Sequence, residues 1–230
     1  MGTEGIVGVA RADTPDGEVA LRRRDGVLEL IVNGAFAMDS REVSTEVRLA
    51  SEALARHTAP GRVLIGGLGL GFTTRAVLAD SRVGLVEVVE RAAPLVQWAR
   101  AGLVPELAGL EGERCRLLVG DIGEVLLGCA GSAGGWDLVL LDVDNGPGFL
   151  IHEGNARLYG VPLLRAARDR LEPGGQLVIW SSHVAPDLLA ALQEAGACPQ
   201  EAAEEIIEVT RQGRLLRYAL YRLTAIWSRN

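Results

Sequence analysis

The feature that most constrains the fold of this chain is an apolar run that ends in closely spaced glycines. Residues 63–71 read Val-Leu-Ile-Gly-Gly-Leu-Gly-Leu-Gly, and a helix-like segment, Phe72 to Asp80, follows them. This order predicts a strand, a tight turn and the N-terminus of a helix. Glycine lets a ligand approach the backbone closely, and a helix N-terminus offers free N–H groups and a positive dipole end. The segment therefore predicts a site for a nucleotide or a nucleoside.

The spacing of the glycines distinguishes between two kinds of nucleotide site. Gly67, Gly69 and Gly71 form G-x-G-x-G, whereas the dinucleotide fingerprint G-x-G-x-x-G needs a glycine where Phe72 stands. This argues against NAD or FAD as the ligand. The alternative interpretation is that these glycines only connect a strand to a helix.

An acidic residue follows the next predicted strand at a suitable distance. Val83 to Val89 is apolar and ends at Glu90, which lies 19 residues beyond Gly71 (90 − 71 = 19). In βαβ nucleotide sites a carboxylate about 20 residues past the glycine turn binds the ribose hydroxyls. Glu87 is a competing candidate, although its place inside the strand is less suited to the edge where ligands bind. The alternative role of Glu90 is that of an acid at the start of a helix.

Length and charge limit the class of protein. A chain of 230 residues fits one domain with a small appendage, and we expect a meander over residues 1–39 and the main domain over residues 40–230. The net charge of −7 disfavours nucleic acid as a partner, and Arg22-Arg23-Arg24 is more typical of a solvated strand edge than of a binding patch.

Residue usage excludes several chemistries. All 23 basic residues are arginine, so the chain has no lysine for a Schiff base or for a phosphate-binding P-loop. Cys115, Cys129 and Cys198 are widely separated, which disfavours a disulfide framework and a structural zinc, and we expect no metal site. The sequence shows no apolar run of 18 residues and no secretory signal pattern, so we expect a cytoplasmic protein without a membrane segment.

The chain begins with strand signals and continues with alternating elements. Asp25-Gly26 and Asn33-Gly34 are strong hairpin signals, and they predict strands over 19–24, 27–32 and 35–38. Asp39 or Ser40 is the expected cap of a helix that ends before Pro60-Gly61. The segments that then alternate between strand and helix patterns are 62–66, 72–80, 83–89, 92–102, 115–119, 122–129, 136–142, 156–171, 176–181 and 186–195.

Alternation of this kind predicts an α/β fold, a Rossmann-like three-layer sandwich with a mostly parallel sheet of seven strands. Residues 205–210 and 215–225 read as the final two strands, an antiparallel hairpin connected by 211–214. The carboxyl ends of the parallel strands share one rim, which we expect to carry Gly67, Glu90, Gly120-Asp121, the segment 142–145 and Ser181-Ser182.

Two groups of acids on this rim are candidates for chemistry. Asp121 can accept a hydrogen bond from an exocyclic amine such as that of adenine, or cap the helix that starts at Ile122, and a cap leaves one oxygen free. Asp142, Asp144 and Asn145 follow a buried strand, where acids can orient an amine and take its proton. The alternative is a turn whose Asp, Asn, Gly and Pro serve the backbone alone.

Histidines form a weaker set of candidates. His152 and Glu153 lie in the loop after this turn and can shape a substrate lid, although a solvated loop histidine is more usual. His57 and His183 are typical of surface or capping positions.

Taken in order, these motifs resemble the class I S-adenosylmethionine-dependent transferases, and within them the spermidine synthase-like family. The resemblance covers most of the chain, from Asn33-Gly34 through the glycine turn to Leu171-Glu172-Pro173-Gly174-Gly175. It implies that Glu90 holds the ribose hydroxyls, Asp121 the adenine amine, and that Asp142 faces the attacking amine. The implied donor is S-adenosylmethionine or its decarboxylated form. The residues expected to bind it are Gly66, Gly67, Gly69, Gly71, Glu90, Asp121 and Ile122.

The chain departs from that family's pattern at four positions. The family's aspartate in the glycine turn falls at Gly69, its glutamine at Ala37, its tyrosine at Ser44 and its second rim aspartate at Asn145, next to Asp144. A diamine carries two cations that need acids or aromatic faces to hold them, so these changes bear on the acceptor.

The leading hypothesis is a transferase that moves an aminopropyl or methyl group to a small acceptor, with an amine as the expected class. The alternative is a catalytically inactive relative that serves as a binding or dimerisation module. A methyltransferase acting on RNA is disfavoured by the acidic surface. We expect a homodimer, because the N-terminal meander has an exposed edge suited to pairing subunits.

Overall fold

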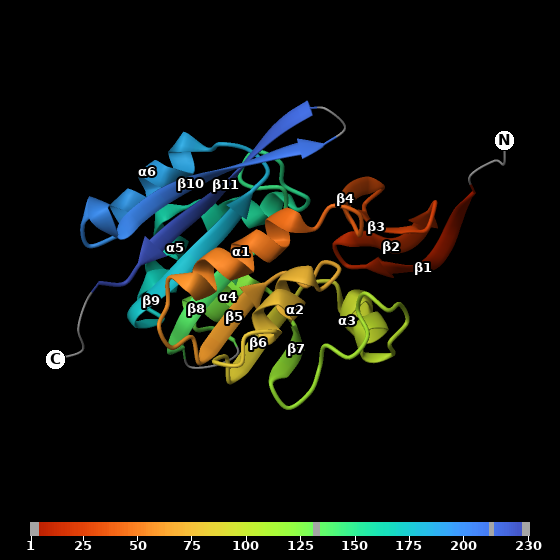
Figure 1. Ribbon diagram of the computed structural model, residues 1–230, viewed down its shortest axis with the longest axis horizontal. Coiled ribbons are helices and arrows are strands. Elements are labelled where there is room, and N and C mark those ends of the chain that lie inside the picture. The colour runs from red at the N-terminus through yellow and green to blue at the C-terminus, as the bar shows by residue number, and fades with distance from the viewer. Residues whose placement is uncertain (1–4, 131–133, 212–213, 227–230) are drawn as a thin grey trace.

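The computed structural model describes residues 5–130, 134–211 and 214–226 (Figure 1). They form a four-stranded sheet in the order β1-β2-β3-β4 and a seven-stranded sheet in the order β10-β11-β9-β8-β5-β6-β7. The predicted fold class is confirmed: a mostly parallel seven-stranded sheet between helices, preceded by an antiparallel meander. In the described part of the chain, no helix has the length and apolar character needed to cross a membrane.

The N-terminal sheet contains one strand more than the sequence predicts. Its strands are β1 (Ile6–Thr14), β2 (Gly17–Arg24), β3 (Val27–Val32) and β4 (Ala35–Asp39). We expected the last three but not β1, whose residues are all exposed or only half-buried and so carry a weak apolar signal. Asp25 and Asn33 have φ of 53° and 52°, and Gly26 and Gly34 also have positive φ, as type I′ hairpin turns require.

The central sheet places its parallel strands as expected. Its strands are β5 (Arg62–Gly66), β6 (Leu85–Glu90), β7 (Cys115–Val119), β8 (Trp136–Leu141), β9 (Leu171–Ser181), β10 (Ala202–Arg211) and β11 (Arg214–Thr224). Strands β5 to β9 run parallel, whereas β11 pairs antiparallel with both β9 and β10. Residues 212–213 of the predicted hairpin connection lie outside the described residues. Because β5, β6 and β8 are adjacent, their carboxyl ends form one edge.

Helices cover both faces of this sheet and bury two apolar cores (Figure 1). The helices are α1 (Ser44–Ala55), α2 (Phe72–Leu78), α3 (Ala93–Arg100), α4 (Ile122–Leu127), α5 (Val161–Arg168) and α6 (Pro186–Ala195), with 3₁₀ helices η1 (Glu153–Tyr159) and η2 (Pro199–Glu201). One core joins α1, α2 and α3 to the N-terminal sheet, and the other contains α4, α5 and α6. The meander therefore packs against the same face as the helix that follows the glycine turn.

Two predicted helix boundaries were wrong. Helix α1 begins at Ser44 after Val43, and the Ser44 N–H donates to Glu42 Oε1 at 3.1 Å. Asp39, one of the two expected caps, instead accepts hydrogen bonds from the N–H groups of Arg41 and Glu42. The single helix expected over residues 156–171 is divided at Gly160 into η1 and α5, since Pro162 at the start of α5 suits the first turn of a new helix.

Glu87, the competing candidate for binding the ribose, has a structural role inside the sheet. Its side chain is 5% exposed and lies inside β6, away from the rim. Its Oε2 accepts a hydrogen bond from the indole Nε1 of the buried Trp136 at 3.0 Å and pairs with Arg62 at 3.4 Å. Glu87 therefore connects β6 to β8 within the sheet, and this contact favours Glu90 as the ligand-facing acid.

We expect Glu87→Ala to lower the free energy of unfolding by about 2–3 kcal/mol, because it leaves the buried Trp136 N–H without an acceptor. Glu87→Gln keeps an amide oxygen in the same place and should cost less. Urea unfolding of both variants at pH 7 measures the difference. An alanine variant as stable as the glutamine variant would show that the contact to Trp136 contributes little.

Candidate active site

The glycine turn is held in a conformation that side chains do not tolerate. Gly67, Gly69 and Gly71 have φ of 92°, 50° and 81°. A Cβ added at Gly67 would lie 2.3 Å from the carbonyl oxygen of Asp142, and one at Gly69 would lie 2.7 Å from Met38 Sδ. The Gly67 N–H donates to the carbonyl of Val89 at 2.9 Å. The turn is therefore packed directly against the ends of β6 and β8, and only glycine fits there.

Glu90 faces this turn from the end of β6. The Leu68 N–H donates to Glu90 Oε2 at 2.8 Å, and the Ala92 N–H donates to Glu90 Oε1 at 2.7 Å. Removal from water raises the pKa of Glu90, and the hydrogen bonds from these backbone N–H groups oppose that rise. Each carboxylate oxygen keeps a second lone pair, so Glu90 can also accept hydrogen bonds from a vicinal diol.

Asp121 caps helix α4 and takes part in ion pairs. Its Oδ1 accepts hydrogen bonds from the N–H groups of Gly123 and Glu124, which confirms the capping role. The expectation of a free second oxygen was wrong: Asp121 Oδ2 pairs with Arg91 NH1 at 2.7 Å, and Arg157 contacts Oδ1 at 2.9 Å. A ligand amine at Asp121 therefore has to share the carboxylate with these cations.

Arg91 connects the rim to the N-terminal sheet. Its guanidinium makes two contacts with Asp16, from Nε at 2.7 Å and from NH2 at 2.8 Å, besides the one with Asp121. The bond to Arg91 holds the pKa of Asp16 below its usual range. Arg91 thus links the turn between β1 and β2 to the N-terminus of α4.

Asp142 lies at the end of β8 beside the glycine turn. Its Oδ2 accepts a hydrogen bond from Thr73 Oγ1 at 2.6 Å, and burial raises its pKa while this bond opposes the rise. Glu46 of α1 lines the same pocket with only 8% of its surface exposed. Burial raises the pKa of Glu46 to about 7, and the charge of Asp142 adds to the rise. The negative charge of Asp142 therefore disfavours ionisation of Glu46.

Asp144 occupies a strained backbone position next to them. Its φ is 56°, a region that non-glycine residues seldom adopt and that is found at functional sites. Its Oδ1 accepts a hydrogen bond from the Ile151 N–H at 2.8 Å, whereas its buried Oδ2 has no partner among the described residues. One carboxylate oxygen of Asp144 is thus left for a ligand.

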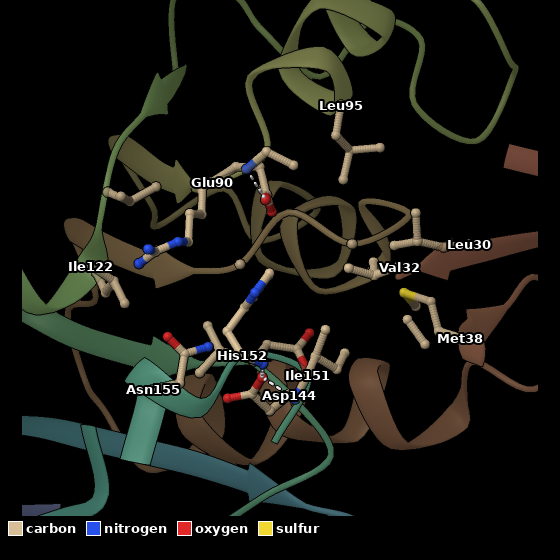
Figure 2. Close-up of a pocket in the computed structure, with 18 of the residues that line it drawn as sticks. Leu30, Val32, Met38, Glu90, Leu95, Ile122, Asp144, Ile151, His152 and Asn155 are labelled. Carbon is tan, nitrogen blue, oxygen red and sulfur yellow. Dashed lines mark hydrogen bonds between the residues drawn. The ribbon is translucent and has the colours of Figure 1, made fainter. Parts of the chain in front are cut away.

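These elements enclose one pocket with two chemically different sides (Figure 2). Figure 2 shows Leu30, Val32 and Met38 of the N-terminal sheet together with Leu95 on one side, and Ile122 and Asn155 on the other. Within the apolar side, the Leu70 N–H contacts Met38 Sδ at 3.3 Å. The pocket is lined both by Ile122 of helix α4 and by residues of the meander.

Most of the predicted site residues share this pocket. The ones that line it are Gly67, Gly69, Glu90, Asp121, Ile122, Asp142, Asp144 and Asn145. Gly66 and Gly71 do not, because Gly66 packs against Ile122 and Leu141 and Gly71 against Leu110. His152 also lines the pocket, and its side chain reaches across it toward Glu90 in Figure 2, whereas Glu153 begins helix η1 outside it.

Sequence reasoning missed several residues of the pocket, chiefly Glu46, Arg91, Met38 and Trp180. Trp180 lies at the carboxyl end of β9, one residue before the predicted Ser181-Ser182. The expectation that strand ends meet at one rim therefore pointed to the residue next to it. Glu46 carried a weaker signal, an acid on a helix face among buried residues. The signal for Met38 was absent, because it reaches the glycine turn from a different sheet.

The charges of the pocket favour a cation. Of the described residues that line it, five are acidic (Glu46, Glu90, Asp121, Asp142 and Asp144) and two, Arg91 and His152, can be positive. Arg91 already pairs with Asp16 and Asp121. A positively charged ligand is therefore stabilised near Asp142 and Glu46.

Comparison with known proteins gives two curated relatives, both named polyamine aminopropyltransferase 2. The one from Hyperthermus butylicus is 31% identical over 135 residues, which is 56% of this chain and 41% of that protein. The one from Pseudomonas aeruginosa is 31% identical over 156 residues, which is 65% of this chain and 42% of that protein. The match thus spans about two fifths of the length of each relative. No protein-family model matches the chain.

Solved structures show the same fold over nearly the whole chain. The spermidine synthase of Thermotoga maritima superposes with a TM-score of 0.77 at 15% identity, covering 95% of this chain and 73% of that one. A spermidine synthase in complex with the transition-state analogue AdoDATO gives 0.75 at 15% identity, covering 95% and 72%. The fold is therefore that of the spermidine synthases, as the resemblance implied.

The raised pKa of Glu46 predicts how the stability of the protein depends on pH. Because its pKa in the folded protein is about 7, above the ordinary value of 4.5, the folded state binds a proton more tightly, and stability falls as the pH rises between these values. Glu46→Gln removes this loss. We expect the unfolding free energy of the variant, relative to the wild type, to rise by roughly 3 kcal/mol from pH 4.5 to pH 7.5.

Urea titrations at several pH values test this, with the exposed Glu113→Gln as a matched control whose difference from the wild type should stay flat. A flat difference for Glu46→Gln as well would show that Glu46 ionises as an ordinary glutamate.

Proposed function

We propose that this chain transfers an aminopropyl group from decarboxylated S-adenosylmethionine to an amine. The observation that carries the proposal is that Asp142 and Glu46 line the same pocket as the glycine turn and Glu90. A nucleoside site and an acidic site for a cation thus meet at one sheet edge, where ligands of α/β sheets bind. The names of the two curated relatives support aminopropyl transfer over methyl transfer.

The residues at the turn fit the nucleoside part of this donor. Gly67 and Gly69 carry no side chain and line the pocket, so a ligand can approach their backbone closely. Glu90 is held by two backbone N–H groups in a position to bind a ribose diol, and Ile122 offers an apolar contact on the adenine side. A sulfonium donor supplies a carbon that is already activated for displacement.

The acids at the end of β8 serve the acceptor. The amine nitrogen must be neutral to attack, so its proton has to leave before or as the new C–N bond forms and the C–S bond breaks. Asp142, oriented by Thr73, can hold the ammonium and take this proton. Glu46 lies in the same pocket with a pKa of about 7 and can share the proton with it. Alignment of the two reactants supplies much of the remaining rate.

We propose in addition that the protein is a homodimer that pairs through its N-terminal sheet. Strands β1 and β4 are the two edges of that sheet. Large apolar side chains are exposed on both edges, with Ile6 55% and Val7 62% exposed on β1 and Phe36 49% exposed on β4. Such edges are suited to pairing with a second copy.

The donor half of the proposal predicts the effect of Glu90→Gln. The amide NH₂ would face a backbone N–H donor and lose one acceptor for the ribose, so we expect the Kd of methylthioadenosine to rise at least about tenfold. Calorimetric titration measures it, with Glu113→Gln as the control for an exposed glutamate. Unchanged binding by Glu90→Gln would place the ribose elsewhere.

The acceptor half predicts the effect of Asp142→Asn. This change keeps the shape of the side chain but removes the charge and the proton acceptor, so we expect the transfer rate to fall by about 10²–10⁴-fold while nucleoside binding persists. Mass spectrometry of the amine products measures transfer, with decarboxylated S-adenosylmethionine and S-adenosylmethionine supplied separately.

Three outcomes of that assay separate the hypotheses. Products larger by an aminopropyl group support the proposal, and products larger by a methyl group contradict it in favour of a methyltransferase. Nucleoside binding without transfer to any amine would favour the inactive binding module.

A further inference from the structure

The acceptor end of the pocket contains an aromatic residue with an unused donor. Trp180 lines the pocket, is 8% exposed, and its indole Nε1 is buried without a hydrogen-bond partner among the described residues. Its ring packs against Tyr218 with a centroid distance of 5.8 Å and an angle of 31° between the ring planes. Buried polar groups are normally hydrogen-bonded, so this donor requires an explanation.

The sheet places this indole beside the acids. Strands β8 and β9 are parallel neighbours, with Leu140 opposite Val178 and Leu141 opposite Ile179. Continuing that register sets residue 142 beside residue 180 at the same edge. Asp144 follows two residues after Asp142, and its Oδ2 is the second buried polar atom at this pocket without a partner.

The two unpartnered atoms have opposite hydrogen-bonding needs. Trp180 Nε1 can only donate, and an ionised Asp144 Oδ2 can only accept. An ammonium group, which only donates, satisfies the carboxylate but not the indole. A hydroxyl group both donates and accepts, so it can satisfy both kinds of atom. A methyl group satisfies neither.

We propose that the acceptor of this enzyme is an amino alcohol, whose amine lies at Asp142 and Glu46 and whose hydroxyl is recognised by Trp180 Nε1 and Asp144 Oδ2. The inference rests on the proposed function, because it assigns the substrate class of that same site. It makes Trp180 the residue that selects oxygen-bearing amines over plain diamines. The apolar stem of the substrate then spans the space between the two polar ends.

The test compares amines that differ in one terminal group. 4-Amino-1-butanol, 1,4-diaminobutane and pentylamine present a hydroxyl, an ammonium and a methyl group on the same four-carbon stem, and their homologues with three carbons control for length. Each is titrated calorimetrically into the full chain saturated with methylthioadenosine, and kcat/KM is measured with decarboxylated S-adenosylmethionine. We expect the amino alcohol to bind about tenfold more tightly than either competitor at the better stem length.

Trp180→Phe keeps the ring and removes only the N–H donor, so it should abolish the preference for the amino alcohol. The matched control is Trp98→Phe, the same change on α3 in a residue that does not line the pocket, and it should keep the preference. Asp144→Asn should weaken both the amino alcohol and the diamine, because each loses a carboxylate acceptor. Thermal unfolding of each variant verifies that it is folded.

The titrations of the amines into the wild-type protein test the inference even if Trp180→Phe does not fold. A diamine that binds as well as the amino alcohol would overturn the inference, as would a preference that survives in a folded Trp180→Phe. Transfer to the diamine in those cases would leave the proposed function intact. Failure of every amine to bind or react would overturn both.

Discussion

The site depends on one carboxylate that joins two strand ends. Glu90 accepts hydrogen bonds from the N–H of Leu68 in the glycine turn and from the N–H of Ala92 at the start of α3. Its own backbone carbonyl accepts from the Gly120 N–H at 3.0 Å, which brings in the end of β7. Three successive rim segments are therefore positioned by a single residue. Because the side chain is already oriented by the backbone, it can bind the ribose of the proposed donor without rearrangement.

The charges around the pocket follow from this framework. The chain has no lysine, and its arginines make directed contacts, as Arg91 does with Asp16 and Asp121. These pairs lie at the mouth and tie the N-terminal sheet to the rim. Glu46 and Asp142 form no ion pair with a basic side chain among the described residues, and the charge of Asp142 raises the pKa of Glu46. The excess of acids among the described residues that line the pocket favours a positively charged ligand such as an amine.

The sequence predicted most of the fold because its signals were local. The Asp-Gly and Asn-Gly hairpins, the glycine turn and the alternation after Arg62 each depend on a few adjacent residues, and the structure confirms all three. The rim residues were also predictable, since the ends of parallel strands converge by topology. Strand β1 was missed because it buries little, and the cap of α1 because Asp39 hydrogen-bonds to a turn instead.

The pocket residues that were missed depend on contacts between distant segments. Glu46 reaches the pocket from helix α1. Its pKa is raised by burial and by the charge of Asp142, which lies almost a hundred positions further along the chain. Trp180 becomes notable only when its unpartnered N–H is seen. Such properties belong to the packed structure, so no pattern within a short window can reveal them.

Gly69 and Met38 illustrate how the residue at one position limits the residue at another. A side chain at Gly69 would meet the sulfur of Met38, which itself receives the N–H of Leu70. An acid at Gly69 therefore needs a different residue at Met38, and the wall that Met38 shares with Leu30 and Val32 would have to move. The turn and the meander are thus packed as one unit, and Met38, Leu30 and Val32 give the pocket an apolar wall beside Gly69. Under the proposed function, the positive charge of the acceptor is consequently directed toward Asp142 and Glu46, on the side of the pocket formed by β8 and α1.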